Sequence, residues 1–96
     1  MLFEWDLGKS IANKEKHGID FESGKLLWSD ENRVEIHAPY PVEDRWILIG
    51  KKKNKLWTAI FTLRGNAIRI VSVRRSRDKE VDLYEKKGIR KEERRA

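Results

Sequence analysis

The chain has 96 residues, a mass of 11.4 kDa and a net charge of +6, which suits one small domain and excludes a second independently folded one. It contains no cysteine, so disulfide frameworks, thiolate metal sites and cysteine nucleophiles are excluded. No apolar run is long enough to cross a bilayer and the first residues lack the order of a signal peptide, so we expect a cytoplasmic protein with no membrane partner.

The charge is unevenly distributed along the chain. Residues 1–44 carry 5 Lys or Arg against 10 Asp or Glu, whereas residues 45–96 carry 17 against 6. A basic half of this kind suits a polyanion such as nucleic acid, because phosphate contacts supply most of the sequence-independent affinity. A solvated charged surface explains the same excess equally well. Charge alone therefore leaves both interpretations open.

The N-terminal part predicts a short strand followed by two helices. Residues 2–5 suit the strand, and Asp6 suits the N-cap of a helix over residues 7–16. Gly18 suits the end of that helix, because glycine readily adopts the left-handed conformation found there. Asp20 then caps a second helix, whose apolar face should pack on a sheet through Phe21, Gly24, Leu27 and Trp28.

The middle of the chain predicts an antiparallel meander. Alternation over residues 33–37 indicates a strand, and the apolar run 45–50 indicates a central strand that ends in a lysine-rich turn. Residues 56–63 and 67–73 indicate two more strands, joined by a tight Gly-Asn turn. Consecutive strands with such short connections pair as antiparallel neighbours.

The last segment predicts a helix over residues 77–87, capped by Ser76 and ended by Gly88. Its apolar content is thin, so it should lie on the surface or against a partner. The charged tail 89–96 is expected to fray. The whole chain, residues 1–96, is therefore expected to form a single α+β domain in which three helices pack with an antiparallel sheet.

The last hairpin yields a candidate binding surface. A two-residue turn places Arg64 opposite Ala67 and Thr62 opposite Arg69, so alternation predicts one face that holds Thr58, Ile60, Thr62, Arg64, Arg69, Val71, Val73 and Arg75. The drier face then holds Trp57, Phe61, Leu63, Ile68 and Ile70. Arg64 and Arg69 flank Thr62 and form a candidate phosphate-binding surface, because one guanidinium group can donate hydrogen bonds to two phosphate oxygens. Pairing of these arginines with acids of the N-terminal half is the alternative.

Further basic and titratable residues extend the set of candidates. Arg74 and Arg75 form a second basic group at the end of the last strand. His17 and His37 are the natural candidates for proton transfer near neutral pH, although His17 also suits a helix-end cation and His37 an ordinary strand end. The chain lacks motifs for nucleotide hydrolysis, zinc catalysis and serine hydrolysis, so we expect no metal site and no cofactor.

Several motifs follow one another along nearly the whole chain in a specific order and spacing: Phe3-Glu4-Trp5-Asp6, Lys9, Asn13, Lys16-His17-Gly18, Phe21, Arg45-Trp46-Ile47-Leu48-Ile49-Gly50, Phe61-Thr62, Arg64-Gly65, Ile68-Arg69-Ile70-Val71-Ser72-Val73-Arg74-Arg75, Glu80 and Tyr84. In these motifs the chain closely resembles the BrnT toxins of type II toxin–antitoxin pairs, within the wider RelE-like group of small ribonucleases. It departs from them in the lysine-rich turn 51–55, which is more basic than usual, and in the charged tail.

This resemblance implies a RelE-like α+β fold, cleavage of RNA that arrests translation, and a ribbon-helix-helix antitoxin. Toxin and antitoxin of this kind typically form a heterotetramer that represses its own operon, so operator DNA is reached only through the antitoxin. The implied functional residues are basic ones: Arg64, Arg69, Arg74 and Arg75, with Lys16 and His17 joining them. The competing interpretation is a non-enzymatic protein that binds an antitoxin or nucleic acid through its basic face.

These candidate residues suggest a mechanism of RNA cleavage that needs no metal ion. The 2′-hydroxyl of RNA attacks the adjacent phosphate and leaves a cyclic phosphate end. Arg64 and Arg69 would stabilise the charge on the phosphorane oxygens, and His17 would act as acid or base. The RNA backbone would be held by Lys16, Thr62, Arg74 and Arg75.

Overall fold

The computed structural model describes residues 1–39, 41 and 43–95, with residues 88–95 described by their backbone alone. Its elements, in chain order, are β1 (Leu2–Glu4), α1 (Leu7–His17), α2 (Phe21–Gly24), the 3-10 helix η1 (Lys25–Ser29), β2 (Val34–Ala38), β3 (Arg45–Lys52), β4 (Lys55–Arg64), β5 (Ala67–Arg75) and α3 (Asp78–Arg95). The predicted α+β class is confirmed.

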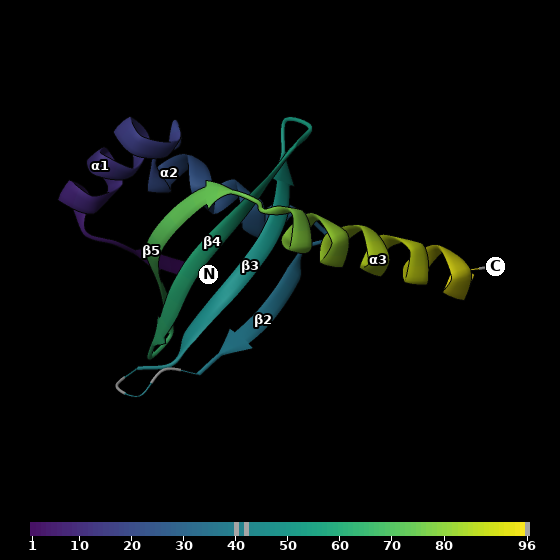
Figure 1. Ribbon diagram of the computed structural model, residues 1–96. Coiled ribbons are helices and arrows are strands. Elements are labelled where there is room, and N and C mark those ends of the chain that lie inside the picture. The colour runs from purple at the N-terminus through teal and green to yellow at the C-terminus, as the bar shows by residue number, and fades with distance from the viewer. Residues whose placement is uncertain (40, 42, 96) are drawn as a thin grey trace.

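The five strands form one twisted sheet in the order β1-β5-β4-β3-β2 (Figure 1). Strands β2 to β5 pair antiparallel with their chain neighbours, as the meander prediction requires. The short β1 pairs in parallel with the start of β5. Helices α1 and α2 lie on the β5 side of the sheet, whereas α3 crosses β3 and β2 and extends past the edge of the sheet (Figure 1).

The predicted caps fix the N-terminal helices. The Asp6 carboxylate accepts a hydrogen bond from the Lys9 N–H at 2.9 Å, and Gly18 ends α1 with a φ of 79°. Asp20 likewise accepts from the Ser23 N–H at 2.8 Å. The second helix differs from the prediction, because it is α-helical for only one turn and continues as the tighter η1.

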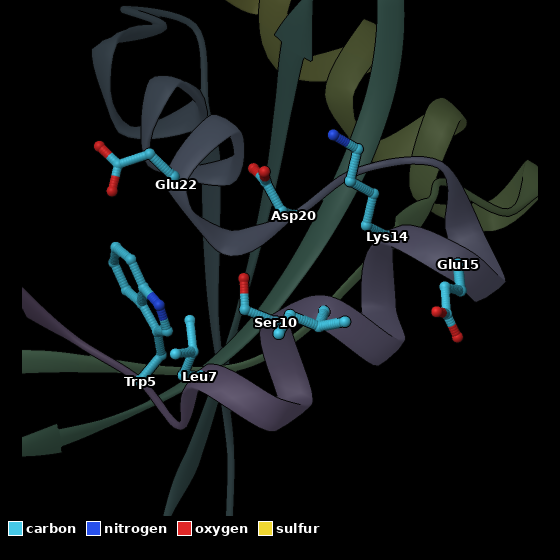
Figure 2. A pocket seen from close by; sticks show the side chains of 8 residues that line it. Trp5, Leu7, Ser10, Lys14, Glu15, Asp20 and Glu22 are labelled. Atoms are coloured by element: carbon cyan, nitrogen blue, oxygen red, sulfur yellow. The ribbon is translucent and has the colours of Figure 1, made fainter.

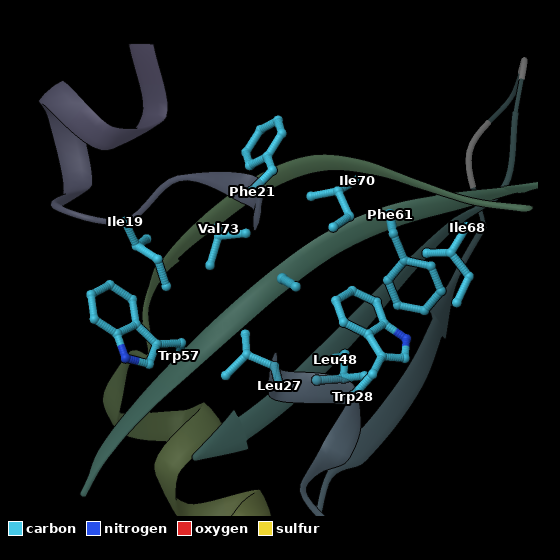
Figure 3. Packing of buried hydrophobic residues seen from close by; sticks show 11 residues of the cluster. Ile19, Phe21, Leu27, Trp28, Leu48, Trp57, Phe61, Ile68, Ile70 and Val73 are labelled. Atoms are coloured by element: carbon cyan, nitrogen blue, oxygen red, sulfur yellow. The ribbon is translucent and has the colours of Figure 1, made fainter. Parts of the chain in front are cut away.

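The core lies between these helices and one face of the sheet, which we call the α1 face. Its sheet residues are Leu48, Trp57, Ala59, Phe61, Ile68, Ile70 and Val73 (Figure 3). Trp28 of η1 packs edge-to-face against Phe61, with ring centroids 5.1 Å apart, and is 7 % exposed. Aromatic packing therefore joins the N-terminal helices to the centre of the sheet.

Asn13 of α1 fastens this helix to the free edge of β5. Its amide donates to the carbonyl oxygens of Ile19 and Val73 at 2.7 and 2.8 Å, and its oxygen accepts from the Val73 N–H at 3.1 Å. Strand β1 pairs only with residues 67–69, so no strand pairs with the outer edge of β5 at Val73. The Asn13 side chain instead satisfies the backbone N–H and carbonyl groups of Val73. One buried amide thus closes the sheet edge.

The register prediction is correct at the hairpin and wrong beyond it. Arg64 pairs with Ala67 and Thr62 with Arg69, as predicted, but the pairing shifts between Ile60 and Phe61, which leaves Val71 as an extra residue. The bulge reverses the alternation, so Val73 and Arg75 lie on the α1 face and not beside the arginines. The opposite face, which we call the α3 face, instead carries Arg74, with Thr58, Ile60, Thr62, Arg64 and Arg69.

Two predictions for α3 are wrong. The helix does not end at Gly88 but continues to Arg95, and among the described contacts no side-chain hydrogen bond from Ser76 caps its start at Asp78. The Ser76 hydroxyl instead lies 2.8 Å from the Thr58 hydroxyl, and the Glu80 carboxylate accepts from the Arg77 N–H at 2.7 Å. Glu80 satisfies the free N–H at the helix start from within the first turn. No helix in the described part of the chain is both long and apolar enough to span a membrane.

Candidate nucleic-acid interface

The α3 face brings together three of the predicted site residues at the end where β4 turns into β5. Thr62 lies directly opposite Arg69 on the neighbouring strand, and Arg64 follows two residues later on the same face. We call Arg64, Arg69 and Thr62 the arginine cluster. The cluster depends on the tight turn, in which Gly65 has a φ of 57° that other residues seldom adopt.

Both arginines of the cluster are paired with carboxylates. The Arg69 guanidinium lies 3.0 Å from Glu4, and Nε of Arg64 lies 3.5 Å from Glu43. Both acids come from the acidic N-terminal half, as the alternative interpretation expected. The Arg64 side chain is nevertheless 54 % exposed, so its ion pair is weak in water and an incoming phosphate has direct access.

Thr62 supplies a hydroxyl without a partner between the two arginines. The residue is 3 % exposed, and its Oγ1 has no hydrogen bond to any described residue. Buried hydroxyls normally have a partner, so the position stands out. Because this hydroxyl is buried, the groups that a phosphate can reach here are the guanidinium groups of Arg64 and Arg69, whose side chains are 54 and 29 % exposed.

Arg74, predicted to hold RNA, is engaged within the protein. Its guanidinium donates two hydrogen bonds to Glu80, at 2.8 and 2.9 Å, and its side chain is 17 % exposed. Partial burial raises the pKa of Glu80, but hydrogen bonds from Arg74, the Arg77 N–H and Thr58 outweigh it and lower this pKa to about 2. The same pair raises the pKa of Arg74. Arg74 therefore joins β5 to α3.

The other predicted residues are distributed over different surfaces. Arg75 lies on the α1 face, with its guanidinium 5.4 Å from the ring centre of Trp57. Lys16 and His17 form the last turn of α1, whose Asn13 contacts β5 at Val73. The structure thus brings Arg64, Arg69 and Thr62 together and does not bring Lys16, His17 or Arg75 to them.

His37, which the sequence offered both as a candidate for proton transfer and as an ordinary strand end, has a carboxylate partner. Its Nε2 lies 3.0 Å from Asp44, and its ring stacks on Trp46 with centroids 4.6 Å apart. The adjacent Glu43 pairs with Arg64, so two consecutive carboxylates connect this imidazole to the arginine cluster. The acidic Glu43-Asp44 step directly before β3 is the signal that could have indicated it.

A cavity of about 420 Å³ lies between α1 and the start of α2 (Figure 2). Its walls combine apolar side chains with one cation and three carboxylates, so the acidic groups outnumber the basic one: Trp5, Leu7, Ile11, Lys14, Glu15, Asp20 and Glu22. Carboxylates repel phosphate, so this cavity does not suit an RNA backbone. In the described part of the chain, no group of three or more His, Asp or Glu side chains has an arrangement that could hold a metal ion.

Residues 5–80 match a family model described as ribonuclease toxin, BrnT, of type II toxin–antitoxin system. The chain belongs to this BrnT family. The match begins at Trp5, contains every strand from β2 to β5, and ends at Glu80, the residue that binds Arg74. The resemblance seen in the sequence is therefore confirmed. No curated protein matches the chain.

Membership of the BrnT family sets the class of activity and partner. BrnT proteins are ribonuclease toxins of type II systems, which supports an endoribonuclease and implies an antitoxin protein as its counterpart. Basic side chains on an exposed sheet face are the chemistry that such an RNA substrate requires.

Proposed function

We propose that the protein is an endoribonuclease toxin that cleaves RNA without a metal ion and so arrests translation. The 2′-hydroxyl attacks the adjacent phosphate, the 5′-oxygen of the next nucleotide leaves, and a 2′,3′-cyclic phosphate remains. The observation that carries this proposal is the arginine cluster, in which the sheet register places Arg64 and Arg69 on the same face as Thr62.

Arg64 and Arg69 are proposed to stabilise the phosphorane formed during attack. Preorganised donors are most effective where negative charge increases in the transition state. Glu4 and Glu43 hold the two guanidinium groups in the free protein, and the phosphate oxygens replace them when RNA binds. Lys16, Arg74 and Arg75 lie away from the arginine cluster, so they are proposed to contact the RNA backbone beyond the nucleotides that the cluster holds.

Proton transfer is assigned to a histidine. The sequence favoured His17, which lies at the end of α1. His37 competes for this role, because Asp44 orients its imidazole and Glu43 ties the same loop to Arg64. A carboxylate that orients an imidazole and stabilises its charged form is a recurring feature of acid–base sites.

The partner is proposed to be a ribbon-helix-helix antitoxin that forms a heterotetramer with the protein in the cytoplasm and represses their common operon. Family membership supports an antitoxin, and the basic surface supports a partner with acidic segments. Operator DNA is contacted through the antitoxin.

The test is incubation of the purified protein with a defined RNA in EDTA, followed by analysis of the fragment ends. Arg64→Ala and Arg69→Ala are each expected to reduce cleavage on the order of a hundredfold, because each removes one donor to the transition state. Lys9→Ala, which removes an exposed cation on α1, is the control and should cleave normally. Undiminished cleavage by the arginine variants would contradict the role proposed for Arg64 and Arg69.

Two further arms complete this experiment. A larger loss for His37→Ala than for His17→Ala assigns proton transfer to His37, and the reverse result assigns it to His17. If RNA binds but no new ends form, even with translating ribosomes present, the protein is the non-enzymatic binding protein that the sequence also allowed.

A further inference from the structure

Unpaired positive charge is concentrated at the hairpin between β3 and β4. Lys52, Lys53 and Lys55 have no ion pair with any described residue, whereas Arg64, Arg69 and Arg74 each have a carboxylate partner. Arg75 reaches the same end of the sheet, and its guanidinium rests on Trp57 without a carboxylate among the described side chains. We call Lys52, Lys53, Lys55 and Arg75 the hairpin cluster.

The cluster is arranged in a way that disfavours folding. Lys52 and Lys55 are directly opposite each other in the ladder, where like charges repel. Lys53 has a φ of 50° and Asn54 a φ of 65°, which defines a two-residue turn in which lysine is an unfavourable choice. Strained or repelling groups that persist without a structural benefit indicate a function.

The cations converge from three adjacent strands. Trp57 pairs with Gly50 on β3 and with Arg75 on β5, so these residues share the α1 face. Lys55 precedes Trp57 by two residues and therefore points to the same face, as does its partner Lys52. The result is a cationic surface beside an aromatic ring, on the opposite face and at the opposite end of β4 from the arginine cluster.

We propose that the hairpin cluster is a second RNA site, which binds backbone phosphates remote from the cleaved bond. The choice of RNA rests on the proposed function. Lys55 and Arg64 are at the two ends of β4, about 30 Å apart at roughly 3.3 Å per residue. A helically stacked strand advances about 3.4 Å per phosphate and needs about nine nucleotides to cover this span, whereas an extended single strand needs fewer. A dinucleotide is too short to reach both sites.

The test compares Lys52→Gln/Lys55→Gln with the control Lys9→Gln/Lys86→Gln, which removes the same charge from exposed positions elsewhere. The probe is a labelled single-stranded 2′-O-methyl RNA of 20 nucleotides, which lacks the attacking hydroxyl and stays intact. The hairpin variant should bind about tenfold more weakly than the control. When the logarithm of RNA affinity is plotted against the logarithm of salt concentration, the slope for the hairpin variant should be less steep than that for the control by about 1.4, because two phosphate contacts are lost.

A dinucleotide probe separates the two sites. It should bind the hairpin variant and the control equally when it occupies the arginine cluster. Equal affinity and equal salt dependence of the two variants with the long RNA would overturn the proposal. Loss of antitoxin binding with unchanged RNA binding would also overturn it, because the cluster would then serve the protein partner.

A charge reversal distinguishes binding from folding. Lys52→Glu replaces the repulsion with an ion pair to Lys55, so it should raise the melting temperature and lower RNA affinity together. A fall in both quantities would overturn the proposal, since unfolding would then account for the loss of binding.

Failure here differs from failure of the proposed function. If long RNA binds through the hairpin cluster but is never cleaved, the proposed function fails and this inference stands. If Arg64→Ala abolishes cleavage while the hairpin variant binds like the control, the proposed function stands and this inference fails.

Discussion

Glu80 shows how a single carboxylate organises the boundary between β5 and α3. It accepts hydrogen bonds from Arg74, the Arg77 N–H and Thr58, and its side chain is 15 % exposed. Such a carboxylate is held ionised, because protonation would remove a charge-assisted acceptor. The residue thus couples the strand end, the helix start and the α3 face.

The lowered pKa of Glu80 predicts a specific pH dependence. A folded-state pKa of about 2, below the ordinary value of 4.5, stabilises the fold above pH 4.5, and this contribution is lost as pH falls towards 2. Glu80→Gln should therefore destabilise the protein by about 1–3 kcal/mol at pH 7, and the difference should shrink below pH 4.5. Urea unfolding at several pH values measures it, with exposed Glu85→Gln as the control. A pH-independent difference would contradict the coupling.

At the scale of elements, α3 is held by polar contacts as much as by apolar ones. The Tyr84 hydroxyl donates to Asp30 at 2.7 Å, and Lys87 donates to the Arg33 carbonyl oxygen at 2.6 Å. Tyr84 itself is 9 % exposed, while Leu83 is 45 % exposed. The thin apolar face seen in the sequence therefore corresponds to a helix that is anchored at a few points.

Tyr84→Phe removes one of these anchors. Burial and the hydrogen bond to Asp30 raise the pKa of Tyr84 to about 12, above its ordinary value of 10. The wild-type protein is therefore more stable than the variant below pH 10, and this difference in stability is lost as pH rises towards 12. We expect a cost of about 1–2 kcal/mol at pH 7. Denaturant midpoints at pH 7 and above pH 10 check this, and a gap that stays constant or widens at high pH would refute the assigned role.

The bulge in β5 explains the main error about the site. Regular alternation placed Arg75 on the same face as Arg69, but the extra Val71 moves Arg74 to that face and Arg75 to the other. The apolar residues already contained the signal, because Ile68 and Ile70 occupy even positions and the buried Val73 an odd one. A change of phase within one strand indicates a bulge.

At the scale of the whole molecule, the two oppositely charged halves of the chain are folded against each other. The acidic half supplies Glu4 and Glu43 to arginines of the basic half, which leaves the remaining positive charge at the β3–β4 hairpin and elsewhere on the surface. The molecule measures 46 × 28 × 24 Å, because α3 extends beyond the sheet (Figure 1). An extended helix and a small core suit a protein that is stabilised by a partner.

We therefore predict that the antitoxin raises the stability of the protein. A ligand that binds only the folded state stabilises it by about 2.7 kcal/mol at a hundred times its dissociation constant. Thermal unfolding of the free protein and of the complex, at equal toxin concentration, measures the shift. Equal melting temperatures would count against it.

The sequence by itself determined the strands, the first helix and the family of this protein, but not the 3-10 form of η1 or the end of α3. Caps such as Asp6, Gly18 and Asp20 act on adjacent residues, and the turn at Gly65 sets the pairing of Thr62 with Arg69, so local chemistry was sufficient. The order of motifs was sufficient for the BrnT family.

Only the tertiary structure decided which charges are paired and which are free. Glu4 and Arg69 are far apart in the chain, as are Arg74 and its neighbour Thr58, and β4 separates the lysine hairpin from the arginine cluster. Such contacts depend on the register of the whole sheet and on the bulge. A change of one residue in the register moves a side chain to the other face of the sheet. The physical reason is that ion pairs form between neighbours in space, whereas the patterns of a sequence describe neighbours along the chain.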